Sequence, residues 1–157
     1  MIDISFNLPG HGWIEFEITD YEVDFGIAAS YISNAPQDFI SCIKTLLEGA
    51  ASAYFRIQSE PMEYRFVFSR VESNINMKIL EFDQAFSRKP DQSGELVFEG
   101  TEDLFRFAKR IFQQFNSLKS TYGMDGYQKT WGYPFPDSQL IQLSQSIERY
   151  EYSKINL

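Results

Sequence analysis

Apolar and polar residues alternate with a period of two along much of the chain, which is typical of strands with one buried face. The longest such stretch is residues 53 to 82, where the pattern predicts a hairpin followed by a third strand. Its apolar positions are Ala53, Phe55, Ile57, Tyr64, Phe66, Phe68, Ile75, Met77 and Ile79. Within each predicted strand these apolar side chains lie on one face of a pleated sheet, so the sheet needs a hydrophobic cover. We take this three-stranded stretch as the element around which the chain is organised.

Alternation also predicts strands near the N-terminus and at residues 96 to 99. Residues 2 to 6 form a short strand that ends at a glycine-rich turn over 9 to 12. In the next strand Ile14, Phe16 and Ile18 point away from the two glutamates between them. Across residues 19 and 20 the parity changes, and a tight turn or a bulge there keeps both apolar sets facing the core. The second set is Tyr21, Val23, Phe25 and Ile27.

Three segments have helical spacing, at about 35–49, 102–122 and 138–152. Residues 84 to 95 predict a mobile loop, and residues 122 to 136 an aromatic connector rich in glycine and proline. Strands followed by a helix, more strands and two helices are typical of an α+β fold. We therefore expect a single domain over residues 1–157, with a mainly antiparallel sheet of about five to seven strands packed against three helices.

The negative charge is concentrated at the start of the chain. The net charge is −8, and the first basic residue is Lys44. The acids before it are Asp3, Glu15, Glu17, Asp20, Glu22, Asp24 and Asp38. Four of these share the predicted solvent face of the second and third strands and form what we call the acidic ladder, with Asp20 beside it at the turn. The ladder residues are Glu15, Glu17, Glu22 and Asp24.

The acidic ladder has two interpretations. It can dock a basic protein and speed association by electrostatic steering. Alternatively, its charges only keep the protein soluble and prevent an edge strand from pairing with other chains. In either case phosphate backbones repel such a surface, so we expect neither nucleic acid nor a membrane as partner.

Candidate catalytic chemistry is sparse. His11 and Cys42 are the only imidazole and the only thiol, so an intramolecular disulfide is impossible and a zinc site of the usual ligands is not expected. Cys42 lies along the apolar stripe of its helix, which favours a small buried hydrophobe over a nucleophile. We expect no catalytic residue, metal or cofactor. A start without a signal-peptide pattern, the single cysteine and the absence of long apolar runs lead us to expect a cytoplasmic protein.

The aromatic connector is the second candidate site. Tyr127, Trp131 and Tyr133 can form an anchor patch for a partner or the wall of a small-molecule cleft. The alternative is that Trp131, Tyr133 and Phe135 pack over one end of the sheet. These possibilities stay open at the level of sequence.

Two stretches look like parts of uncharacterised bacterial proteins that protect cells against toxins delivered by neighbours. They are Glu60-Pro61-Met62-Glu63-Tyr64-Arg65-Phe66 and Tyr127-x-x-x-Trp131-x-x-Pro134-Phe135-Pro136. With its one-sided acidity and lack of active-site residues, the chain resembles bacterial toxin-immunity proteins, including those of contact-dependent growth inhibition. The resemblance implies a non-enzymatic protein that blocks a cognate toxin, often a basic nuclease, by tight binding. The alternatives are a small-ligand-binding protein or enzyme with a cleft beside residues 122–136, and a homo-oligomeric structural subunit.

Overall fold

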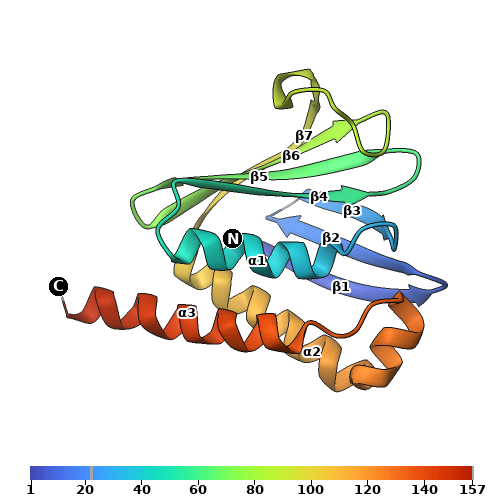
Figure 1. The fold of residues 1–157 in the computed structure, drawn as a ribbon. Coiled ribbons are helices and arrows are strands. Elements are labelled where there is room, and N and C mark those ends of the chain that lie inside the picture. Colours follow the sequence, from blue (N-terminus) through green and yellow to red (C-terminus); the bar gives the residue numbers. More distant parts are fainter. Residues whose placement is uncertain (22, 157) are drawn as a thin grey trace.

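The computed structural model describes residues 1–21 and 23–156 and confirms an α+β fold (Figure 1). The described strands divide between two antiparallel sheets, of three strands in the order β1-β2-β3 and of four in the order β4-β5-β6-β7. The strands are β1 (Ile2–Gly10), β2 (Trp13–Asp20), β3 (Val23–Ser30), β4 (Ser52–Gln58), β5 (Glu63–Val71), β6 (Asn74–Phe82) and β7 (Glu95–Asp103). The helices are α1 (Ala35–Leu47), α2 (Leu104–Trp131) and α3 (Asp137–Ile155), with a short 3-10 turn η1 (Asp91–Ser93).

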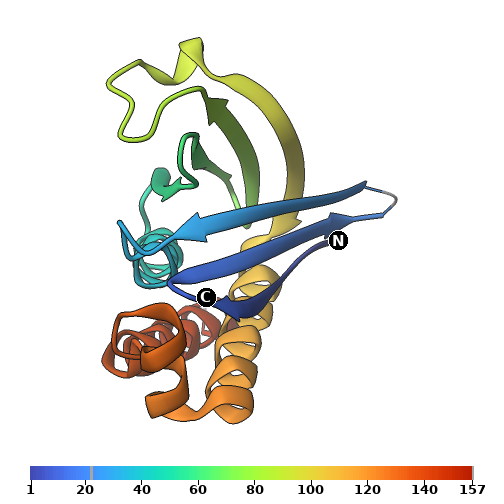
Figure 2. The same cartoon turned by 90° about the vertical axis from the view of Figure 1, so that its right-hand side faces the viewer.

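The helices hold the two sheets together. Helix α1 packs against β4 and α3, and α2 packs along β1. Figure 2 shows the four-stranded sheet curving at the top of the molecule. Helices α2 and α3 lie at the bottom, and the three-stranded sheet lies between them and the four-stranded sheet. No helix among the described residues is both long and apolar enough to cross a membrane.

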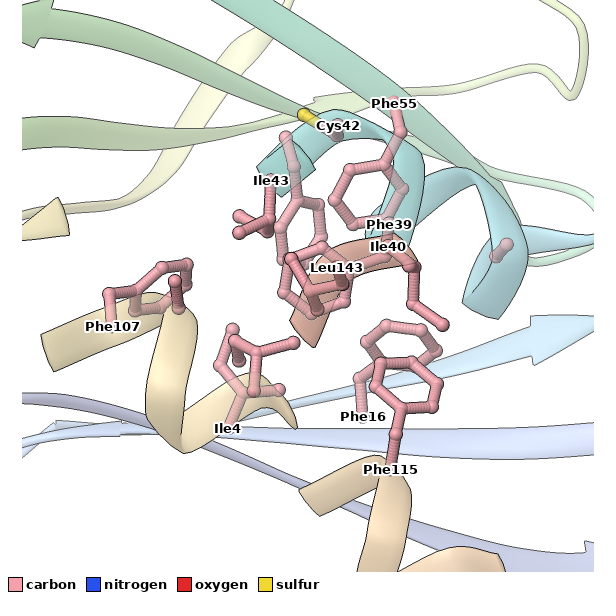
Figure 3. Packing of buried hydrophobic residues seen from close by; sticks show 14 of the residues in the cluster. Ile4, Phe16, Phe39, Ile40, Cys42, Ile43, Phe55, Phe107, Phe115 and Leu143 are labelled. Carbon is pink, nitrogen blue, oxygen red and sulfur yellow. The ribbon is translucent and has the colours of Figure 1, made fainter. Parts of the chain in front are cut away.

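One phenylalanine connects all layers of the core. Phe39 of α1 stacks on Phe55 of β4 with ring centroids 4.7 Å apart. Its ring also lies within 6.4 Å of rings from the three-stranded sheet, from β5 and from α2 (Figure 3). Those rings belong to Phe6, Phe16, Phe66, Phe107 and Phe115. The apolar faces predicted for residues 53–82 are confirmed, because their central side chains are buried in this core.

A tight hairpin joins β2 and β3, as one of the two predicted alternatives, but two residues that the pattern placed in the core are exposed. Asp20 pairs with Val23, so the change of parity is a tight hairpin. Tyr21 is 93% exposed and Val23 is half exposed, whereas the pattern placed both in the core. The inward set of β3 therefore begins only at Phe25, because Tyr21 and Val23 project beyond the layer that covers the sheet.

The predicted stop of the long helix at Gly123 is present, but the chain resumes a helix directly after it. Gly123 has φ 69° and ψ 166°, a conformation that glycine adopts without steric cost. Residues 124 to 131 then form further helical turns. Much of the connector is therefore a helix rather than an irregular segment.

The loop predicted to be mobile is fastened to the four-stranded sheet. Arg65 of β5 donates hydrogen bonds to the main-chain carbonyls of Ser87 and Lys89, at 2.9 and 2.7 Å, and to Asp91 at 3.0 Å. Phe86 donates its main-chain N–H to the side chain of Gln58. The loop thus covers one end of the outer face of the sheet, which alternation alone assigns to solvent.

Glu102 joins three elements at one end of the molecule. Its carboxylate accepts hydrogen bonds from the main-chain N–H of Ile2 at 3.1 Å and from the guanidinium of Arg110 at 2.6 Å. Partial burial by itself raises the pKa of Glu102, but the hydrogen bonds from Asp103, Arg110 and Ile2 outweigh burial and hold the pKa below its usual value. Glu102 therefore stabilises the fold in its charged form.

We expect Glu102→Gln to lower the free energy of unfolding by about 2 kcal/mol at neutral pH. Because the folded pKa is depressed, the contribution of Glu102 is fully present above its unfolded pKa and is lost as the pH falls through the folded value. The difference between wild type and variant should therefore shrink as the pH falls below the ordinary glutamate pKa of 4.5. Urea unfolding at several pH values measures it, with Glu99→Gln on the exposed face of β7 as control. A difference independent of pH contradicts this account.

Candidate functional site: an acidic sheet face

The outer face of the three-stranded sheet carries carboxylates from all of its strands. Alternation turns Ile4, Phe16 and Ile18 into the core and leaves the intervening residues outside. We define the acidic face as four residues on that outer side. They are Asp3 of β1, Glu15 and Glu17 of β2, and Asp24 of β3.

The register places Glu17 at the centre of the acidic face. Thr19 pairs with Asp3 on one side and with Asp24 on the other, so both aspartates are diagonal neighbours of Glu17. Diagonal neighbours in antiparallel sheets are about 7–8 Å apart. Glu17 pairs directly with Gly26, and both of its carboxylate oxygens lie 3.4 Å from the point where a Cβ at position 26 would be. A small neighbour thus leaves the Glu17 carboxylate uncovered.

The charges of the acidic face are not compensated within the described residues. None of its four carboxylates takes part in an ion pair in the described part of the chain. Strands β1, β2 and β3 contain no lysine or arginine. Glu15 accepts only a hydrogen bond from the neutral amide of Asn7, at 3.2 Å. Like charges this close repel one another, and a cationic partner would relieve that repulsion.

The structure separates Asp20 from the ladder. Asp20 has the parity of the core residues of β2, and its carboxylate lies 3.1 Å from the N-terminal ammonium of Met1. It also lies close to Gly100 of β7, in the space that a larger side chain would fill. Asp20 therefore closes the seam between the two sheets and does not extend the acidic face. Glu22 lies outside the described residues.

The aromatic connector is part of the core. Tyr127 and Trp131 are fully buried, so their assignment to a partner-binding surface is corrected. They are four residues apart on a helical segment, and this spacing puts both on its inward side. Trp131 donates from Nε1 to Asn34 at 3.4 Å, and Tyr133 donates its hydroxyl to the carbonyl of Tyr31 at 2.6 Å. The connector packs over one end of the three-stranded sheet.

Sequence reasoning missed two residues of this region. Asp3 belongs to the acidic face, but the alternation within residues 2–6 does not say which strand lies beside β1. Tyr21 was assigned to the core and is instead the most exposed large hydrophobic side chain of the described residues. The turn in the sequence could have indicated the exposure of Tyr21, because residues at the tip of a hairpin leave the layer of the sheet.

The sole cysteine lies in the core (Figure 3). Burial, with a smaller effect from Asp38, raises the pKa of Cys42 to about 12. The thiol is therefore protonated at neutral pH, and a protonated thiol is a poor nucleophile. His11 is exposed at the turn between β1 and β2.

Two hollows bear on the small-molecule alternative. One of about 700 Å³ lies between α1 and β4, away from the connector. Near the start of the connector there is a hollow of about 90 Å³, which Tyr122 lines. A drug-sized ligand needs a pocket of about 300 Å³ or more. The connector residues 127–133 thus fill space rather than enclose it.

Comparison with known proteins does not assign the chain to a family. No family model matches the sequence, and no curated protein matches it. A solved structure that resembles the chain is described as the CdiA-CT/CdiI toxin and immunity complex from Enterobacter cloacae. A chain of that complex is 11% identical, with a TM-score of 0.44, over 77% of this chain and 100% of the other. The likeness is too distant to carry an argument about function.

Proposed function

We propose that this protein is a cytoplasmic immunity protein, which neutralises a cognate bacterial toxin by docking its acidic face on a basic surface of that toxin. The observation that carries the proposal is the cluster of four carboxylates without a cationic partner among the described residues. The identification of the partner as a toxin rests on the sequence resemblance to toxin-immunity proteins.

The acidic face suits a basic protein partner for electrostatic reasons. Lysine and arginine side chains of the partner would pair with Glu17 and its neighbours and remove the repulsion among them. A surface of one sign also raises the rate of diffusional encounter, and this gain decreases as salt screens the charges.

Tyr21 is the apolar residue best placed to anchor such a complex. It is 93% exposed at the β2–β3 turn, directly after the strand that carries Glu15 and Glu17. Tyrosine is enriched among the residues that contribute most to binding, because it buries a large area with few rotatable bonds. In this proposal Tyr21 takes the role that the sequence assigned to the connector aromatics.

The test compares wild type with the variant Glu15→Lys/Glu17→Lys/Asp24→Lys in affinity capture from the native cells at low and high salt. We expect wild type to retain a basic protein and the variant to lose it. With that protein purified, stopped-flow mixing should show an association rate reduced about tenfold or more and a weaker salt dependence. Urea unfolding should show that the variant folds with a stability close to that of wild type, because the three side chains lie on the outer face of the sheet.

The matched control is Asp125→Lys/Glu148→Lys/Glu151→Lys. It makes the same change in net charge at exposed positions of α2 and α3, outside the acidic face. It should capture the partner as wild type does. Equal capture by the acidic-face variant, or an equal loss with both variants, removes the acidic face from the account. A captured basic protein without toxic activity would refute the immunity role while leaving the docking surface intact.

A further inference from the structure

A surface groove runs between α1 and β4. The two elements follow one another in the chain, run in opposite directions and lie side by side (Figure 1). The groove has a volume of about 700 Å³. Its helical wall presents mostly small side chains at helical spacing, and β4 with one loop residue forms the other wall. The helical wall consists of Asp38, Ser41, Cys42 and Thr45.

Strand β4 borders the groove with an unpaired edge. In the four-stranded sheet β4 pairs only with β5. The main-chain N–H of Arg70 donates to the carbonyl of Ala51, at 2.8 Å, and the N–H of Ser59 donates to the carbonyl of Met62, at 2.7 Å. Opposite residues of an antiparallel pair exchange both hydrogen bonds at every second position. The odd-numbered residues of β4 are therefore bonded to β5.

It follows that the even-numbered residues direct their main-chain groups away from β5, toward the free edge. They include Tyr54 and Arg56, which also line the groove. Among the described residues, no turn, loop or side-chain hydrogen bond satisfies the main-chain groups of Tyr54 or Arg56. Such an edge is a template for the main chain of another extended segment.

The charges of the groove favour a cationic residue in that segment. Arg56 is already compensated, because its guanidinium lies 3.7 Å from Glu63 and donates to the carbonyl of Ser87 at 3.2 Å. Asp38, on the opposite wall, has no ion-pair partner in the described part of the chain. Partial burial raises the pKa of Asp38, and a neighbouring cation would reverse that effect. The buried hydroxyl of Ser33, near the start of α1, also has no hydrogen-bond partner there.

We propose that the groove binds an extended segment of a partner polypeptide, which adds to the sheet along the free edge of β4 and places a lysine or arginine beside Asp38. The segment would exchange main-chain hydrogen bonds with Tyr54 and Arg56, as in other cases of strand addition. Successive side chains of a strand alternate between faces, so one set would face the small residues of α1. The other set would lie beside the exposed rings of Tyr54 and Phe86, where apolar side chains are favoured.

This surface shares no residue with the acidic face, and the inference does not depend on the proposed function. A second copy of the chain is a competing occupant of the same edge. Analytical ultracentrifugation with amide hydrogen exchange of the free protein distinguishes the two. We expect a monomer in which the amides of Tyr54 and Arg56 exchange fast and that of Phe55 exchanges slowly. A dimer in which Tyr54 and Arg56 are already protected overturns the proposal.

The binding test uses a displayed library of random peptides long enough to span β4. We expect wild-type protein to select peptides that contain lysine or arginine and that slow the exchange of the Tyr54 and Arg56 amides. Asp38→Asn should reduce the affinity of a selected peptide about fivefold to tenfold. Tyr54→Pro, which removes a free-edge N–H without affecting the bonds to β5, should weaken binding more than the control Tyr54→Ala.

A second set of peptides leaves the protein unchanged, in case the proline variant fails to fold. Each selected peptide is made in two forms, one methylated at the main-chain nitrogens of its odd residues and one at those of its even residues. The form that lacks the N–H groups facing β4 should not bind, and the other form should bind. Equal binding of the two methylated forms, or selection of no peptide by wild-type protein, overturns the proposal.

Discussion

Replacing Arg65 with methionine should lower the free energy of unfolding by about 3–5 kcal/mol, which is the cost of breaking a buried ion pair from one side. Arg65 is 2% exposed, and its Nε lies 2.7 Å from the carboxylate of Glu63, which is fully buried. The guanidinium also lies 3.9 Å from the ring centroid of Phe82. The substitution leaves the buried Glu63 carboxylate with only the more distant guanidinium of Arg56, at 3.7 Å, as a cationic neighbour.

The same substitution should release the loop over residues 84–94. Two main-chain carbonyls of that loop, those of Ser87 and Lys89, would lose the Arg65 donor, and that of Ser87 would keep only the hydrogen bond from Arg56. Losing hydrogen bonds from a charged donor is costly, so the loop is expected to detach from the sheet. Amide exchange and limited proteolysis of the loop would report that detachment, and urea unfolding would report the loss of stability.

The double variant Glu63→Gln/Arg65→Met is the control for this interpretation. It removes the buried charge and keeps a side-chain oxygen that can accept the hydrogen bond from Gln58. We expect the double variant to be more stable than Arg65→Met alone. If the two are equally unstable, the loss comes from the packing of Arg65 and not from the unpaired carboxylate.

Phe39→Ala should lower the free energy of unfolding by about 3–5 kcal/mol, because it opens a cavity at the point where both sheets and two helices meet. The ring of Phe39 is fully buried and lies within 6.4 Å of six other phenylalanine rings, counting Phe55. Urea or thermal unfolding measures the loss. Phe39→Leu should recover part of it, because a branched aliphatic side chain fills part of the space.

Phe86→Ala is the matched control for the core prediction. Phe86 has the same side chain but is 58% exposed, so its truncation should change the free energy of unfolding by less than about 0.5 kcal/mol. If Phe39→Ala also lowered the free energy of unfolding by less than about 0.5 kcal/mol, the core would have collapsed around the missing ring. The role of Phe39 as the junction of the layers would then be wrong.

The acidic face could be predicted in part. The parity of Glu15, Glu17 and Asp24 on their strands placed them on a solvent face, and the structure agrees. Asp3 joined them only because β1 pairs with β2, which a local pattern does not specify. Asp20 was separated from them because it meets the N-terminal ammonium and β7. That contact involves segments distant in the sequence.

By itself the sequence determined the α+β class, the inward faces of the strands, the approximate helices, the break at Gly123 and the segregation of charge. These follow from local periodicity, turn chemistry and composition. Only the tertiary structure decided the division into two sheets, the burial of Tyr127 and Trp131, the cover over Arg65 and the free edge of β4. Alternation states on which side of its own strand a residue lies, but what covers that side is supplied by segments far along the chain.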